Sequence, residues 1–380
     1  MNSRTQEQPA DEGAAPKDRG RPREERRGPH GGPGAEAGGT GTGAGEGGPG
    51  SGAAQADLTS RPVAGPRATR VLAGAGPLAP PGEQDTVRLR DRRPEGPPRY
   101  APEWLRLREP ADAAARAHEL LDPLRSGLSG RPGPSRLSGP GPAGGLVVHD
   151  IGCGTGSMGR WLAPRLEGAQ HWILHDRDPH LLHFAAVASP RSAADGSRVT
   201  VETRCGDVGR LTARALAGAA LVTASALLDV LTREEVVALV GACAGAGCSA
   251  LFTLSVAGRV DLSPSDPLDA EITEAFNAHQ RRTGLLGPDA AAVAGEAFAE
   301  RGATVRVHPS LWRLGPAQSE LTAQWLRGWV GAAVEQRPRL AGAAERYLQE
   351  RLAACEAGEL RVVVHHSDLL ALARPADGAP

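Results

Sequence analysis

A glycine-rich turn behind an apolar segment constrains the fold of this chain more than any other feature. The apolar run Leu146–His149 is followed by Asp150, and three glycines then come at Gly152, Gly154 and Gly156. Glycine allows positive φ and lets the backbone approach a ligand closely. A helix over Ser157–Leu166 would point its N-terminal amides at the same place. The sequence therefore predicts a buried strand, a tight turn and a helix, with a ligand site at the turn.

The same alternation continues along the chain. Further strands are predicted at Trp172–Leu174, Val199–Arg204, Ala220–Ala224, Ala250–Val256, Thr304–His308 and Leu360–His365. Helical patterns occur at Pro179–Val187, Leu211–Ala217, Thr232–Ala246, Asp266–Arg282, Pro288–Arg301, Ser319–Glu335 and Ala341–Glu356. This order predicts a doubly wound α/β fold, with a seven-stranded mixed sheet and helices on both faces. The extra helices should lie over the carboxyl edge of the sheet, where such folds bind ligands.

Glycine and proline mark the domain boundaries. They crowd into the first third of the 380 residues, and residues 1–83 hold too little apolar surface to offset the entropy of folding. We therefore expect a disordered tail over 1–83, and a helical cap and linker over 84–145 whose helix, Tyr100–Leu128, is interrupted at Pro110. The folded domain is expected over 146–380. Its helical insertions are predicted at 262–285 and 315–357.

Charge and cysteine content exclude several classes of protein. The formal net charge is −1, so no global field favours nucleic acid or a membrane surface. Five cysteines without a CxxC pair argue against a disulfide framework and against a zinc site. The polar N-terminus lacks the apolar core of a signal peptide, and no apolar run of about 18 residues occurs. We expect a cytoplasmic protein with no metal, membrane or nucleic-acid partner.

Two acids follow the next two predicted strands. Asp176 lies 24 residues after Gly152, where a carboxylate can accept both hydroxyls of a ribose. It can equally cap the following helix, although Asp178 is available for that role. Asp207 ends the third strand, where it can accept the amino group of adenine or simply belong to a turn.

Four segments resemble the class I methyltransferases that use S-adenosylmethionine (SAM). They are HDIGCGTG (149–156), LHDRDP (174–179), CGDV (205–208) and ALVTASALLDVL (220–231). Ala220 departs from the acidic residue that usually starts the last segment. The resemblance implies a Rossmann-like fold, SAM as cofactor, and direct displacement of its methyl group by an unidentified acceptor, which we expect to be a small molecule.

The resemblance also implies roles for individual residues. Asp150 would order the turn and act on the methionine ammonium, and Asp176 would bind the ribose hydroxyls. Other cofactor contacts are implied for Gly152, Gly154, Gly156, Asp207, Val208, Ser225 and Ala226. Asp229 and His279 are candidate catalytic residues. Asp229 can equally be a solvated or capping acid, and His279 can simply lie on an exposed amphipathic helix.

Two other functions stay open at this point. Gly154, Gly156 and Gly159 satisfy the GxGxxG pattern of dinucleotide-binding proteins, so an NAD(P)-dependent oxidoreductase is an alternative. Asp150 and the Gly206–Asp207 pair fit SAM better. A non-catalytic SAM-binding module is the other alternative. The sequence indicates neither the acceptor nor the oligomeric state.

Overall fold

A computed structural model of the protein describes residues 101–129, 145–206 and 211–374. All of them belong to the second of two units into which the chain divides, Leu78–Pro380. The predicted tail over 1–83 and most of the predicted linker lie outside the described residues.

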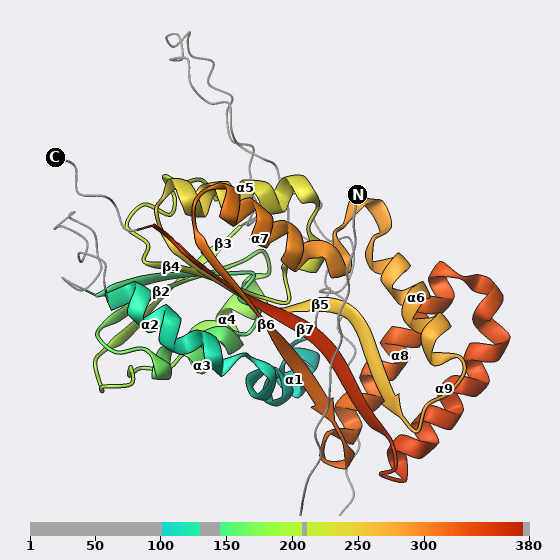
Figure 1. The fold of residues 1–380 in the computed structure, drawn as a ribbon. Coiled ribbons are helices and arrows are strands. Elements are labelled where there is room, and N and C mark those ends of the chain that lie inside the picture. Colours follow the sequence, from blue (N-terminus) through green and yellow to red (C-terminus); the bar gives the residue numbers. More distant parts are fainter. Residues whose placement is uncertain (1–100, 130–144, 207–210, 375–380) are drawn as a thin grey trace, which may run out of the picture. The chain divides into compact units, whose positions relative to one another are not determined.

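A seven-stranded mixed sheet forms the centre of this unit (Figure 1). Its order is β3-β2-β1-β4-β5-β7-β6, and only β7 runs antiparallel to its neighbours. The strands are β1 Leu146–Ile151, β2 Gln170–Asp176, β3 Val199–Cys205, β4 Leu221–Ser225, β5 Ser249–Ser263, β6 Thr304–Leu314 and β7 Arg361–Leu372. The predicted sheet is confirmed. Because β1 to β5 are parallel, their carboxyl ends meet at one edge.

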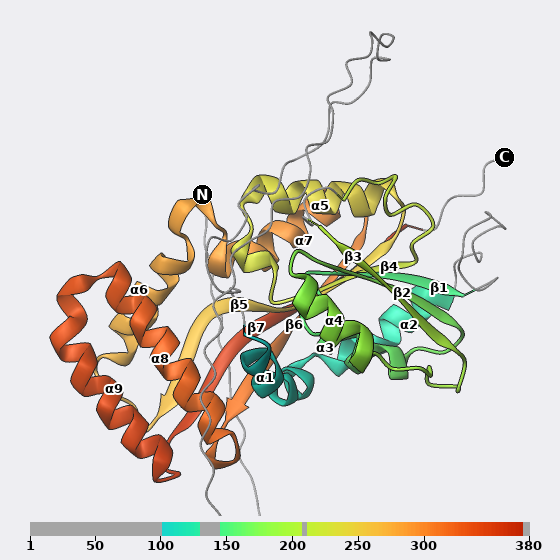
Figure 2. The same ribbon diagram turned by 180° about the vertical axis from the view of Figure 1, so that it is seen from behind.

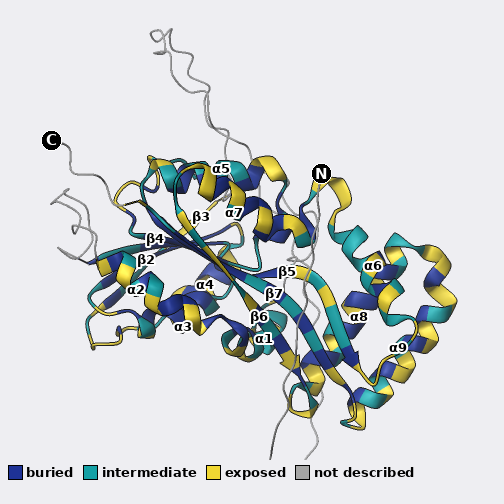
Figure 3. Ribbon diagram, in the orientation of Figure 1, coloured by how far each residue is buried: buried dark blue, intermediate teal, exposed yellow. Residues whose placement is uncertain are grey.

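Helices cover both faces of the sheet (Figures 1 and 2). One face packs against α5, Arg233–Gly245, and α7, Ala290–Glu300. The other packs against α2, Leu121–Ser129, α3, Ser157–Leu162, and α4, Pro179–Ala188. The apolar strands between these layers are buried along most of their length (Figure 3), as expected for strands covered on both faces.

A further helical layer lies beyond the carboxyl ends of the parallel strands. After its pairing with β4 ends at Thr253, β5 continues to Ser263 beside β7. The helices α6 Asp269–Gln280, α8 Ser319–Gln336 and α9 Ala341–Glu356 pack with this extension around buried aromatic residues (Figures 1 and 2). The predicted insertions therefore form helices at the edge of the sheet where ligands are expected.

Two predicted elements are wrong. Residues 213–218 form turns rather than a helix. So short a segment cannot nucleate a helix on its own, and Leu216 is buried against the sheet without one. The helix α1, Pro102–Ala115, runs through Pro110 and ends instead at Ala115, with Arg116 as its C-cap. There the next amide, of Ala117, donates to Asp368 Oδ2 at 2.8 Å, so a tertiary contact and not the proline sets the break.

Candidate functional site

The glycine turn connects β1 to α3 at the carboxyl edge of the sheet. Gly152, Gly154 and Gly156 have φ values of 62°, 55° and 85°. A Cβ added to each would lie 3.2 Å from an atom of Leu227, Leu105 and Ala185, respectively. The turn is therefore enclosed by the loop after β4, by α1 and by α4, and only glycine satisfies both its backbone and its space.

Asp176 braces the turn from the end of β2. Its Oδ2 accepts from the Gly154 amide at 2.9 Å, and its Oδ1 accepts from the Asp178 amide at 3.0 Å. Burial raises the pKa of Asp176, while these two hydrogen bonds act to lower it. The cap of α4 is Asp178, which accepts from the His180 amide at 2.8 Å. The Asp176 side chain is thus directed to the turn, and capping is not its role.

Asp150 lies beneath the turn and is almost completely buried. Its Oδ1 accepts from Thr223 Oγ1 on the neighbouring strand at 2.7 Å. Its Oδ2 is also buried and has no hydrogen-bond partner among the described residues. Burial raises the pKa of Asp150 to about 7. A buried carboxylate oxygen without a donor is costly, so this atom fits a ligand that brings an N–H group.

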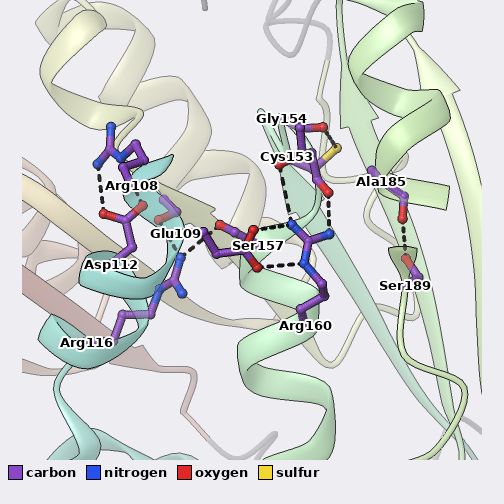
Figure 4. Close-up of polar contacts among 12 residues, drawn as sticks. Arg108, Glu109, Asp112, Arg116, Cys153, Gly154, Ser157, Arg160, Ala185 and Ser189 are labelled. Carbon is purple, nitrogen blue, oxygen red and sulfur yellow. Dashed lines mark hydrogen bonds and ion pairs between the residues drawn. The ribbon is translucent and has the colours of Figure 1, made fainter. Parts of the chain in front are cut away.

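Arg116 lies beside the turn, although sequence reasoning did not single it out. The residue is about 1% exposed. Its Nη2 donates to Ser157 Oγ at 3.1 Å (Figure 4). It also donates to Ser225 Oγ at 3.2 Å. Its Nε and Nη1 are buried and have no hydrogen-bond partner among the described residues. Nothing local marks this arginine, because the contact between Ala117 and Asp368 places it.

A second arginine ties α1 to the turn. Arg160 on α3 forms a two-pronged ion pair with Glu109 on α1, at 2.7 and 2.6 Å, and also donates to the Thr155 carbonyl (Figure 4). All of these donors and acceptors are engaged within the protein. Arg160 therefore fastens the helix over the turn, whereas Arg116 keeps two donors free.

The loop after β4 adds the third side of the site. Ser225 receives the Arg116 contact, and Ala226 adopts a positive φ of 50° with its amide bonded to the Thr253 carbonyl. Asp229 follows in the short helix Leu228–Val230, where it is buried and its Oδ1 has no partner among the described residues. Burial raises the pKa of Asp229 to about 6. The expectation of a solvated acid at this position is wrong.

The candidate catalytic residue His279 is not brought to the turn. His279 lies 3.0 Å from Glu335 of α8, at an exposed contact between helices. Asp207 and Val208 lie outside the described residues. His149 and His175 stack with their ring nitrogens 3.0 Å apart, and burial lowers their pKa values to about 3 and about 4, so both rings are neutral.

The described ranges contain neither a metal-binding cluster nor a membrane-spanning helix. No group of three or more His, Cys, Asp or Glu side chains there could hold a metal ion. In the same ranges, no helix has the length and apolar character needed to cross a membrane.

Comparison with known proteins gives structural similarity only. No family model and no curated protein matches the sequence. The cyclopropane synthase MmaA2 from Mycobacterium tuberculosis is 13% identical over 71% of this chain and 93% of its own, with a TM-score of 0.35. The phosphoethanolamine N-methyltransferase 2 of Haemonchus contortus, solved with SAM, is 14% identical over 73% and 58%, with a TM-score of 0.34.

A third similar structure is the magnesium protoporphyrin IX methyltransferase of Synechocystis PCC 6803. It is 18% identical over 50% of this chain and 76% of its own, with a TM-score of 0.31. The sheet itself, seven-stranded and mixed with helices on both faces, is the Rossmann-like fold expected from the sequence.

Proposed function

We propose that this chain transfers a methyl group from SAM to a small-molecule acceptor. The observation that carries the proposal is the charge at the glycine turn. The turn lies between two buried carboxyl groups, and Asp150 Oδ2 beneath it lacks a donor. A cation 4 Å from a carboxylate near a protein surface gains about 4 kcal/mol, and an anion loses as much. Beside these two carboxyl groups, the site therefore favours the ammonium and sulfonium of SAM over the pyrophosphate of NAD(P).

The residues of the site fit the parts of this cofactor. The backbone of the turn at Gly152, Gly154 and Gly156 would contact its methionine and ribose portions, as the sequence resemblance implies. Asp176 keeps lone pairs for the ribose hydroxyls while it braces the turn. Asp150 accepts from the ammonium, directly or through water. By the sequence resemblance, Asp207 and Val208 frame the adenine, and Ser225 and Ala226 border the methyl group.

The chemistry divides between cofactor and protein. The cofactor supplies an activated methyl group. The protein aligns the acceptor with that group and excludes water. Where the acceptor carries a proton, we assign its removal to Asp229, because this side chain is buried, has an oxygen without a donor among the described residues, and has a pKa raised toward neutrality. We favour Asp229 over His279, which is already paired with Glu335.

Equilibrium binding tests the proposal against the oxidoreductase. S-Adenosylhomocysteine, the product form of the cofactor, should bind in calorimetry, and NADH should not. Asp176→Asn should weaken that binding by about 1.5–3 kcal/mol, because it removes a charge-assisted contact. Asp178→Asn, which alters only the cap of α4, is the matched control. Binding of NADH alone would contradict the proposal, and cofactor binding without transfer of a labelled methyl group to a cell extract would indicate a non-catalytic module.

A further inference from the structure

We infer that Arg116 binds the carboxylate at the amino-acid end of the cofactor, so that the site selects ligands carrying both an ammonium and a carboxylate. This inference rests on the proposed function. It starts from the guanidinium itself, which is buried with Nε and Nη1 free of partners. Arginine stays charged in proteins. A buried cation with two donors that lack a partner is costly unless an anion meets it, and Nε–H can give a carboxylate a charge-assisted hydrogen bond.

The acids around Arg116 do not fill this role. Asp112 is bound through both oxygens by Arg108, at 2.9 and 3.1 Å, and its Oδ1 also accepts from Trp312 Nε1. Asp368 accepts from the amides of Ala117 and Leu254 and from Ser310 Oγ. These carboxylates support the charge of Arg116 from a distance. None of them forms a hydrogen bond or an ion pair with its guanidinium within the described part of the chain.

The direction of the free Nε–H follows from the contacts of Nη2, because these two nitrogens share one edge of a guanidinium, as they do in the ion pairs of Arg108 and Arg160. Nη2 bonds to Ser157, the first residue of α3, and to Ser225, the last residue of β4. These two residues flank the place where the glycine turn ends. The ring of Trp161 lies 5.5 Å from the guanidinium carbon and limits its movement. Arg116 is therefore held at the turn by its neighbours, with donors to spare.

Asp150 supplies the opposite charge at the same turn. Among the described residues, Asp150 Oδ2 has no hydrogen-bond donor, and Nε and Nη1 of Arg116 have no acceptor. The α-ammonium and α-carboxylate of an amino acid satisfy both groups at once. A ligand with only one of these groups leaves the other side chain buried and unpaired, so the pair discriminates against nucleosides that lack a complete amino-acid end.

The test removes the carboxylate from the ligand and the guanidinium from the protein, separately and together. The ligands are S-adenosylhomocysteine and its decarboxylated form, S-adenosyl-3-thiopropylamine, and affinities are measured by calorimetry. The wild-type protein should bind the first about 10- to 150-fold more tightly, the range of a charge-assisted pair. Arg116→Met should abolish this preference and leave the affinity for the decarboxylated ligand nearly unchanged. Arg116→Lys should keep part of the preference, because it keeps the charge without the planar fork.

Arg165→Met is the matched control, because Arg165 also lies over the Trp161 ring, at 5.0 Å, but bonds to the Trp161 carbonyl. It should keep the full preference. A partly unfolded variant lowers the binding stoichiometry for both ligands and not the ratio of their affinities. If Arg116→Met binds S-adenosylhomocysteine with the wild-type preference, or weakens both ligands equally, the role of Arg116 is refuted while the proposed function stands. If wild-type protein binds neither ligand, the proposed function fails as well.

Discussion

Asp150 and Asp229 are two buried acids at the carboxyl edge of the sheet, and each has one oxygen without a donor. Burial raises the pKa of the first to about 7 and of the second to about 6. In the unfolded chain both should ionise near pH 4. Because the folded pKa is the higher one, each acid contributes stability that is complete below pH 4 and is lost as pH rises through the folded pKa.

Asp150→Asn should therefore become more stable than the wild-type protein as pH rises from 4 to 7. The gain is at most about 1.4 kcal/mol for each pH unit, and it levels off above pH 7. Urea unfolding of both proteins over this range measures the difference. A difference that does not change with pH would show that Asp150 ionises normally in the folded protein.

The pH dependence of cofactor affinity should distinguish the role of Asp150 from that of Asp229. S-Adenosylhomocysteine should bind wild-type protein more tightly as pH rises toward 7, because its ammonium needs the ionised form of Asp150. Asp150→Asn should remove this dependence. Asp229→Asn is the control with a comparable buried charge, and it should show the stability effect only up to about pH 6 while the pH dependence of binding persists.

The candidate site divides, residue by residue, into what the sequence could and could not reveal. The glycines, Asp150 and Asp176 follow predicted strands directly, so their meeting at one edge follows from parallel pairing alone. Arg116 does not follow a predicted strand, so the sequence pattern gave no reason to place it at this edge. Its position depends on a bond between Ala117 and Asp368, which lie 251 residues apart, and its importance appears only when the partners of each buried nitrogen are counted.

At the scale of elements, contacts with distant parts of the chain also explain why the bounds of α1, β5, β6 and β7 differ from the predicted ones. Local pattern predicted a break at Pro110, but the end of α1 is set by a distant strand. The strands β5 and β6 are longer than predicted because their outer halves alternate buried and exposed residues. In β7 the missed part is residues 366–372, which pair with the inner half of β5 and in which His366, Ser367 and Asp368 interrupt the apolar pattern. Where the local signal was complete, as in the helix predicted at Thr232–Ala246, the prediction is confirmed, and α5 begins there with a capping box of Thr232 and Glu235.

Helix α1 is held over the turn by side chains along its length. Glu109 pairs with Arg160 and Asp112 accepts from Trp312 on β6, while Leu105 covers Gly154. Glu109→Gln should loosen this cover, since a half-buried pair of this kind contributes about 1 kcal/mol. We expect faster amide hydrogen exchange in α1 and weaker binding of S-adenosylhomocysteine, by about three- to tenfold.

Glu274→Gln is the matched control for α1. Glu274 on α6 forms a similar two-pronged pair with Arg337, at 2.7 and 3.3 Å, in the helical layer away from the turn. This variant should leave exchange in α1 and the affinity for S-adenosylhomocysteine unchanged. Equal effects of the two substitutions would mean that α1 has no special part in holding the cofactor.

At the scale of the whole chain, the described elements that touch the turn all belong to the second of the two units. The described contacts of the site come from α1, α3, α4 and the ends of β1, β2 and β4. The chain divides between Pro77 and Leu78, and the composition of the first 83 residues offers little apolar surface to bury. The folding energy should therefore come from the second unit.

Removing residues 1–77 should leave that unit intact. We expect the melting temperature to change by less than about 2 °C, which corresponds to less than about 1 kcal/mol, and the affinity for S-adenosylhomocysteine to change by less than about twofold. Differential scanning calorimetry and titration of the full-length and shortened chains measure both. A large fall in melting temperature with unchanged affinity would assign the tail to the packed core. A loss of affinity at unchanged melting temperature would instead place part of the tail in the cofactor site, so the two readouts together locate whatever role these residues have.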